Sequence, residues 1–188
     1  MKYRDLYSKD FLRQFKDYEL AVGDIELEDD KFSIDVLKIV EVCDIPVEYD
    51  IVIHSGWSYF DRNSERKIVV NFSEPEYRQR FTLAHELGHI ILEHSGMKFR
   101  TADPSKYADE ITRVQERLAN KFAAELLMPK KLVILAVRKS ATKLGYILDD
   151  KFTPWQVDEI IKATAYEMNV SFQTLKIRLE QLQVFVDA

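Results

Sequence analysis

Residues 80–92 read Arg-Phe-Thr-Leu-Ala-His-Glu-Leu-Gly-His-Ile-Ile-Leu, and the interpretation of the whole chain starts from them. His85 and His89 are four positions apart, with Glu86 directly after the first, which is the H-E-x-x-H spacing typical of zinc sites. Residues four apart on a helix lie one turn from each other on the same face, so both imidazoles can reach one metal ion. Glu86 is rotated by about 100° from His85. It can therefore flank the metal and a bound water without ligating the ion, as a general base must.

The flanking sequence predicts that this motif lies in the middle of a helix from about residue 74 to 93. Ser73 is a candidate N-cap, and Pro75 suits the first turn. Apolar residues then recur at spacings of three and four, which is the helical pattern: Phe81, Ala84, Leu87, Gly88, Ile91 and Leu92. The Ser-Gly pair at 95–96 is expected to end the helix.

A catalytic zinc ion normally has three protein ligands and keeps a fourth position for water, so a third ligand must follow the motif. The candidates are acidic or histidine side chains: Glu93, His94, Asp103, Asp109, Glu110, Glu116 and Glu125. Glu116 is the best choice, because it lies in a second predicted helix that the Asp-Pro pair at 103–104 would begin and Pro129 would end. Small residues would let this helix approach another closely: Ala119, Ala123 and Ala124.

Two of these candidates are disfavoured by helical rotation. His94 is nine positions after His85, and Glu125 is nine positions after Glu116. Nine residues correspond to about half a turn beyond two full turns, so each side chain should point away from the metal. We expect His94 to be a cation at the end of its helix or a hydrogen-bond partner of a ligand, rather than a ligand.

The motif of residues 80–89 is followed by a second motif, Glu-x-x-Ala-Asn at 116–120, which continues as Phe-Ala-Ala-Glu-Leu-Leu-Met-Pro at 122–129. In this order, the two motifs resemble the ImmA/IrrE family of zinc metallopeptidases. The similarity extends from about residue 34 to 129. It implies a zincin-like fold, three zinc ligands and a catalytic glutamate: His85, His89 and Glu116 as ligands, and Glu86 as the base.

The resemblance also implies a narrow substrate, typically a helix-turn-helix repressor of the Xre type from a phage or mobile element. Two other functions stay open. The chain could be a toxin, or a regulator in a pair of the toxin–antitoxin kind, acting by binding a helix-turn-helix partner. It could also carry the motif by chance and hold no metal, although Glu116 in the expected place argues against this.

Composition indicates an ordinary globular protein of 188 residues, with 46% hydrophobic and 31% charged residues. A formal charge of −5 does not favour nucleic acid or an anionic membrane as the main partner. Cys43 is the only cysteine, which excludes an internal disulfide and a thiolate zinc cluster. The first residues lack the apolar run of a signal peptide, and no stretch has the length of a membrane span, so we expect a cytoplasmic protein.

The predicted fold class is α+β: a mainly helical, zincin-like domain with a small antiparallel sheet before the H-E-x-x-H helix. Strands are expected around residues 47–53, 57–60 and 66–72, where β-branched and aromatic residues lie between turn signals. We divide the chain into an N-terminal arm with an acidic linker (1–30), a zinc peptidase core (31–129) and a C-terminal helical segment packed on the core (130–188).

The C-terminal segment ends in two predicted helices that resemble a helix-turn-helix. Thr153 and Gln156 form a capping box for the first, and Ser171 is a candidate cap for the second. The second helix offers Gln173, Lys176 and Arg178 to DNA, but also Glu180. Because the chain is acidic overall, we expect a packing or partner-docking role, and direct nucleic-acid binding is disfavoured.

The predicted chemistry is hydrolysis of a peptide bond. Zinc lowers the pKa of its bound water to about 7. Glu86 would take the proton of this water and return it to the leaving amine. Tyr107, Tyr59 and His54 are candidates for stabilising the oxyanion, and the sequence does not choose among them. His54, at a strand end, is expected to be structural rather than catalytic.

Overall fold

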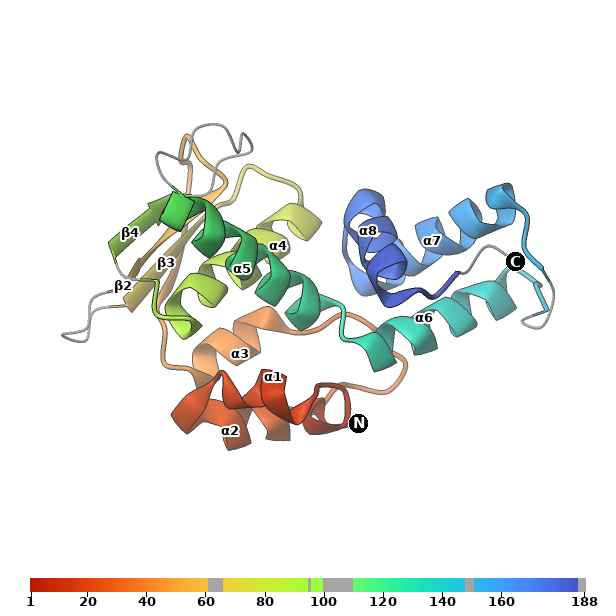
Figure 1. Cartoon of the computed structure of the whole chain (residues 1–188), viewed down its shortest axis with the longest axis horizontal. Coiled ribbons are helices and arrows are strands. Elements are labelled where there is room, and N and C mark those ends of the chain that lie inside the picture. Colours follow the sequence, from red (N-terminus) through yellow and green to blue (C-terminus); the bar gives the residue numbers. More distant parts are fainter. Residues whose placement is uncertain (61–65, 95, 100–109, 148–150, 186–188) are drawn as a thin grey trace.

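The computed structural model describes residues 1–60, 66–94, 96–99, 110–147 and 151–185. Helices predominate and a small sheet lies at one end (Figure 1), so the predicted α+β class is confirmed. Among the described residues, every helix is too short or too polar to serve as a membrane span. The elements follow in the order η1 (Tyr3–Asp5), α1 (Lys9–Arg13), η2 (Lys16–Tyr18), α2 (Glu19–Asp24), α3 (Val36–Val42), β1 (Val47–Asp50), β2 (Gly56–Phe60), β3 (Arg66–Asn71), α4 (Glu76–Ile91), β4 (Gly96–Phe99), α5 (Glu110–Leu127), α6 (Lys130–Lys143), α7 (Pro154–Met168) and α8 (Phe172–Leu182).

The sheet differs in two details from the antiparallel sheet expected ahead of the motif helix. Its strand order is β1-β3-β2-β4, and β1 runs parallel to β3 while the other pairs are antiparallel. The sheet is therefore mixed. Its fourth strand, β4, follows the motif helix in sequence and pairs with β2, so β2 is an inner strand and β1 and β4 are the edges. Periodicity within a strand does not specify its neighbours, which is why sequence could not give this order.

The motif helix α4 packs against β2 and β3, and Gly56 at the start of β2 makes the approach close. A Cβ atom on Gly56 would lie 2.5 Å from Cγ2 of Thr82 on α4 and 2.6 Å from the carbonyl oxygen of Val69 on β3. Both distances are too short for real contacts, so only glycine fits. The close packing at Gly56 therefore places the side chains of β2 that face α4 next to the H-E-x-x-H motif.

Both ends of α4 differ from the prediction. The helix begins at Glu76 and not near residue 74, because Ser73 is not its N-cap: the backbone N–H and hydroxyl of Ser73 both donate to Oδ1 of Asn71. Pro75 takes the cap position without a side-chain hydrogen bond. At the other end the helix stops at Ile91, and Glu93 adopts a positive φ of 56°. This left-handed residue turns the chain before the Ser-Gly pair that was expected to end the helix.

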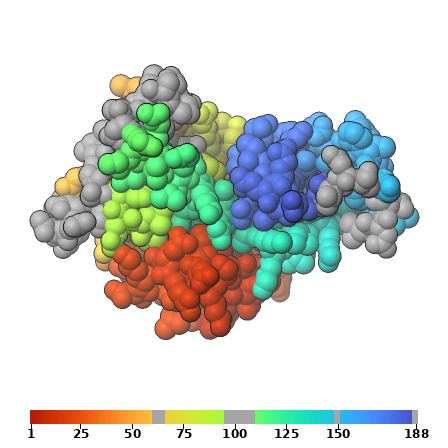
Figure 2. Space-filling model, viewed as in Figure 1, coloured from red at the N-terminus to blue at the C-terminus, as the bar shows by residue number. Residues whose placement is uncertain are grey.

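The first 24 residues form short helices that pack beneath α4 and α5, where they form a lobe in the space-filling view (Figure 2). The rings of Phe11 and Phe15 lie 5.2 and 5.6 Å from the ring of Phe122 on α5. The hydroxyl of Tyr7 donates to the backbone carbonyl of Leu126 at 2.6 Å. The N-terminal segment thus supports the helix that carries Glu116 and satisfies a carbonyl near its end.

The C-terminal helices α6, α7 and α8 form a second group beside α4 and α5 (Figure 1). The capping box of Thr153 and Gln156 is present at the start of α7, and Ser171 caps α8, as predicted. Arg178 of α8 donates to the backbone carbonyl of Met128 at 3.1 Å, directly after α5. Asn169, in the left-handed turn between α7 and α8, donates to Oε1 of Glu76 at 2.6 Å. These contacts join the C-terminal helices to both helices that carry the motifs.

Candidate metal centre

Three side chains from two helices converge where α4 crosses α5. Nε2 of His85 lies 3.1 Å from Oε2 of Glu116, and Nε2 of His89 lies 3.2 Å from Oε1 of Glu116. The two Nε2 atoms are 3.0 Å apart. All three residues are buried, with at most 3% of their surface exposed. The structure thus brings together the two histidines of the first motif and the glutamate of the second.

Helix geometry and one glycine account for this convergence. His85 and His89 lie one turn apart in the buried middle of α4, so their rings point the same way. Gly88 faces α5, and a Cβ atom there would lie 3.0 to 3.3 Å from the side chain of Phe122. Because Gly88 has no side chain, α5 can approach α4 closely enough for the Glu116 carboxylate to reach His85 and His89.

The other nitrogens of both imidazoles also have partners. Nδ1 of His85 lies 3.1 Å from Oδ1 of Asn120, one turn after Glu116 on α5. An amide oxygen only accepts hydrogen bonds, so Nδ1 of His85 donates to Asn120, and Nε2 is the ring nitrogen that faces Glu116. Nδ1 of His89 lies 2.9 Å from Nδ1 of His94. Such contacts fix the orientation of a histidine ring and suit it to metal binding.

His94 therefore lies nearer to the centre than helical rotation suggested. The prediction that it faces away assumed that the helix continues to residue 94. The helix instead ends at Ile91, and the left-handed Glu93 returns the buried His94 toward His89. The contact with His89 agrees with the expectation that His94 is a hydrogen-bond partner of a metal ligand rather than a ligand itself.

The remaining candidates for a third ligand lie elsewhere or outside the described residues. Glu93 forms an exposed ion pair with Lys16 on the surface. Glu110 is exposed at the first position of α5, and Glu125 is half-buried. Asp103 and Asp109, and the Asp-Pro start predicted for α5, fall outside the described residues.

Glu86 points from α4 toward the sheet. It is fully buried, and its Oε2 accepts a hydrogen bond of 2.6 Å from the hydroxyl of Ser58 on β2, which is itself buried. Sequence reasoning had no signal for Ser58, because its proximity depends on how β2 packs on α4. Since successive side chains of a strand alternate between faces, Tyr59 points away from Glu86. This disfavours Tyr59 as an oxyanion donor; His54 is exposed before β2, and Tyr107 lies outside the described residues.

The electrostatics favour an ionised Glu116. Burial alone would raise the pKa of its carboxyl, but hydrogen bonds and positive charge from His85 and His89 outweigh burial and hold the pKa well below its usual range. The only thiol is different, because burial raises the pKa of Cys43 to about 12 and keeps it protonated. In the part of the chain that the structure describes, one group of residues is suited to a metal ion, and it is His85, His89 and Glu116.

This donor set fits a metal ion. The three ligand atoms lie within 4.8 Å of one another, and two imidazole nitrogens with one carboxylate oxygen are ligands that zinc accepts. A buried cluster of this kind, with Asn120 and His94 orienting the rings, would hold the ion by three protein atoms and leave a position open for water.

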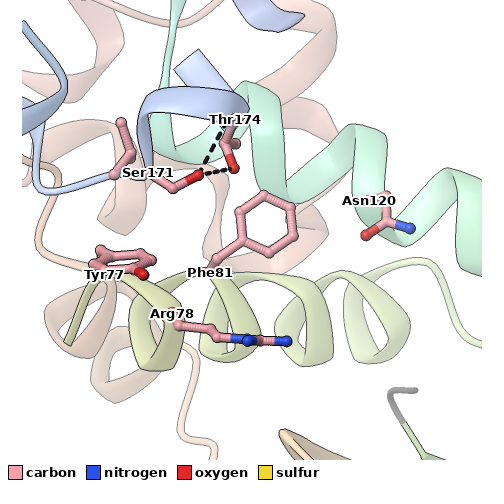
Figure 3. Close-up of a pocket in the computed structure, with 7 residues that line it drawn as sticks. Tyr77, Arg78, Phe81, Asn120, Ser171 and Thr174 are labelled. Carbon is pink, nitrogen blue, oxygen red and sulfur yellow. Dashed lines mark hydrogen bonds between the residues drawn. The ribbon is translucent and has the colours of Figure 1, made fainter. Parts of the chain in front are cut away.

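A groove of about 440 Å³ lies between the first half of α4 and the start of α8 (Figure 3). Its lining comes from three helices and the turn before α8: Tyr77, Arg78, Phe81, Asn120, Val170, Ser171 and Thr174. Asn120 contacts the Nδ1 edge of His85, whereas the Nε2 edge faces Glu116. The groove therefore adjoins the back of a ligand ring and not the side where a metal ion would bind.

Comparison with known proteins gives the family. The model of the IrrE N-terminal-like domain, a peptidase family, matches residues 47–180, which is well over half of the chain. The chain belongs to this family. The matched range includes both motifs and extends through the C-terminal helices almost to the end of α8. The ImmA/IrrE resemblance inferred from the motifs is thereby confirmed, and the family to which the chain belongs is a peptidase family.

Two relatives of this IrrE-like protein share part of its sequence. The radiation response metalloprotease IrrE of Deinococcus radiodurans is 35% identical over 80 residues, covering 42% of this chain and 24% of the relative. The protein of the same name from Deinococcus deserti is 38% identical over 66 residues, covering 35% of this chain and 24% of the relative. The similarity thus spans about a quarter of the length of these curated relatives.

Proposed function

We propose that this IrrE-like protein is a zinc-dependent endopeptidase of the H-E-x-x-H, gluzincin-like type, with Glu116 as the third ligand. The observation that carries the proposal is the buried convergence of His85, His89 and Glu116, with Glu86 on the same helix. Zinc, when bound, would act as a Lewis acid and lower the pKa of a bound water to about 7.

The protein's own groups then have separate tasks. Glu86 takes a proton from the attacking water and returns it to the leaving amine, so that the broken peptide bond ends as a carboxylate and an amine. Asn120 and His94 orient the ligand rings through their Nδ1 atoms. The burial of all these reacting groups supports a narrow specificity, since a polypeptide must fit this protein closely to reach them.

As substrate we propose a helix-turn-helix regulator of the Xre type, encoded beside this protein on a phage or mobile element and cleaved in the cytoplasm. The formal charge of −5 is complementary to the basic surface of a DNA-binding protein. Direct DNA binding by α8 is disfavoured, because Arg178 already donates to the carbonyl of Met128 and Lys176 lies 3.6 Å from Asp158.

The test is to incubate the purified protein with the regulator encoded by the neighbouring gene and to identify fragments by mass spectrometry. We expect one or a few defined cuts with zinc present, and none with a chelator. Glu86→Gln should retain zinc, measured by inductively coupled plasma mass spectrometry, and should lose cleavage by at least about 100-fold. Cleavage that survives either change would refute the proposed mechanism.

The second candidate is a regulator, or a toxin–antitoxin partner, that acts by binding alone. It draws on exposed aromatic residues of α7, where Trp155 is 67% and Tyr166 is 87% exposed. The same variant separates the two functions. If Glu86→Gln retains the full biological effect of the wild type, binding is the activity; if the effect disappears while the partner still binds, proteolysis is.

A further inference from the structure

The hydrogen bond between Ser58 and Glu86 joins the sheet to the catalytic motif. The donor and acceptor oxygens are 2.6 Å apart, and the two residues are 1% and 0% exposed. An ionised carboxylate only accepts hydrogen bonds, so the Ser58 hydroxyl is the donor. A hydrogen bond to a charged acceptor is about twice as strong as one between neutral groups.

The fold holds Ser58 firmly in this place. β2 is an inner strand, and Ser58 is paired with Ile68 of β3 on one side and with Lys98 of β4 on the other. Two residues earlier, Gly56 permits the contact with Thr82 that sets the spacing between β2 and α4. Strand alternation puts Gly56 and Ser58 on the same face, so the glycine that allows the approach also brings the hydroxyl to Glu86.

We propose that Ser58 is a positioning residue for Glu86: its hydroxyl holds the buried carboxylate in the orientation from which the base takes and returns the proton. A buried carboxylate on a helix could otherwise adopt several rotamers, each with a different distance to the reacting water. The inference rests on the proposed role of Glu86, and it adds a residue that belongs to neither sequence motif. A displacement of about 1 Å at a reacting group can cost about 100-fold in rate.

The kinetic test compares Ser58→Ala, Ser58→Thr and the control Ser55→Ala. Ser55 precedes β2 and donates to Glu74 at 2.9 Å, so its loss removes a similar hydrogen bond away from the motif. For Ser58→Ala we expect kcat to fall about 10- to 100-fold, with KM and zinc content unchanged. Ser58→Thr, which keeps a hydroxyl, should recover most of this loss, and Ser55→Ala should retain wild-type kcat. Wild-type kcat in folded Ser58→Ala would overturn the proposal.

A second measurement does not depend on peptidase activity. The thermal unfolding midpoints of wild type, Ser58→Ala, Glu86→Ala and the double variant form a cycle. If the two side chains interact, Ser58→Ala should shift the midpoint clearly less in the Glu86→Ala background than in wild type. Additive shifts would refute the contact. If the wild-type protein cleaves no partner while the cycle shows coupling, the proposed peptidase function fails and the Ser58–Glu86 contact stands. A failure of the proposed function can therefore be distinguished from a failure of the contact.

Discussion

Each imidazole at the centre has one nitrogen toward Glu116 and the other toward a neighbouring side chain. The Nε2 atoms of His85 and His89 face the carboxylate, and their Nδ1 atoms face Asn120 and His94. This arrangement of the two ring nitrogens matters because a neutral imidazole carries one proton. A hydrogen-bond partner at Nδ1 determines which nitrogen carries that proton and which can bind a metal ion. Asn120 and His94 therefore help to determine which nitrogen of each histidine can bind a metal ion.

The first prediction concerns the third ligand. Glu116→Ala should lower the zinc content sharply, because two protein ligands leave an incomplete site. The stoichiometry is measured by inductively coupled plasma mass spectrometry after dialysis. Glu125→Ala, nine positions later on α5, is the matched control and should bind zinc like the wild type. Equal zinc content in the two variants would mean that the third ligand is a different residue.

The second prediction concerns Asn120. Asn120→Ala removes the acceptor at Nδ1 of His85, and we expect the affinity for zinc to fall about 10- to 100-fold. Competition with a chelating dye measures the affinity. Lys121→Ala changes the next residue of the same helix, which is exposed, and should leave the affinity unchanged. An unaltered affinity in Asn120→Ala would show that the His85 ring is held by packing alone.

At the scale of elements, the crossing of α4 and α5 depends on residue 88. Alanine favours a helix over glycine by about 1 kcal/mol, so Gly88→Ala would be stabilising if space allowed. The added Cβ atom would meet Phe122 at 3.0 Å, and the Phe122 ring is held between Phe11 and Phe15. Since the Phe122 ring cannot move aside easily, the cost of overpacking should exceed the gain in helix propensity.

We therefore expect Gly88→Ala to lower the free energy of unfolding by about 1–3 kcal/mol and to weaken zinc binding by separating Glu116 from the histidines. Chemical denaturation of the zinc-free protein measures the first effect, and dye competition measures the second. Gly23→Ala in α2 is the control, since its Cβ atom would lie at an ordinary 3.5 Å from Arg4. Stabilisation by Gly88→Ala would show that Phe122 can adjust.

Over the whole molecule, Arg80 connects three parts of the chain. From α4 it donates through Nη2 to the carbonyl of Ile34 at 2.7 Å and through Nε to the carbonyl of Asn169 at 3.4 Å. Burial lowers the pKa of the guanidinium, and the nearby carboxylates of Glu76 and Asp35 oppose this shift. Arg80, five residues before His85, thereby holds the segment leading into α3 and the turn between α7 and α8.

The fourth prediction follows from these two contacts. Arg80→Met retains much of the side-chain volume and removes both hydrogen bonds, so the free energy of unfolding should fall by about 2 kcal/mol. Chemical denaturation measures the loss. Arg78→Met is the control: its side chain is 45% exposed and pairs with Glu74, just before α4, and its effect should be within about 0.5 kcal/mol. Equal effects of the two variants would refute the connecting role of Arg80.

Sequence alone determined the features that depend on local spacing. Two histidines four residues apart share a helix face in any α-helix, and the capping box at Thr153 and the cap at Ser171 depend on neighbours within one turn. The choice of Glu116 also came from sequence, through its second motif. Both ends of α4 were misjudged, because Asn71 binds Ser73 and Glu93 takes a left-handed conformation.

Only the tertiary structure decided which distant side chains meet. The parallel pairing of β1 with β3, the pairing of β4 with β2 and the contact of Ser58 with Glu86 join residues far apart in the chain. Periodicity states which face of an element is apolar, but not which element covers it. That choice depends on close packing between elements, here made possible by Gly56 and Gly88, whose missing side chains allow the backbones to approach.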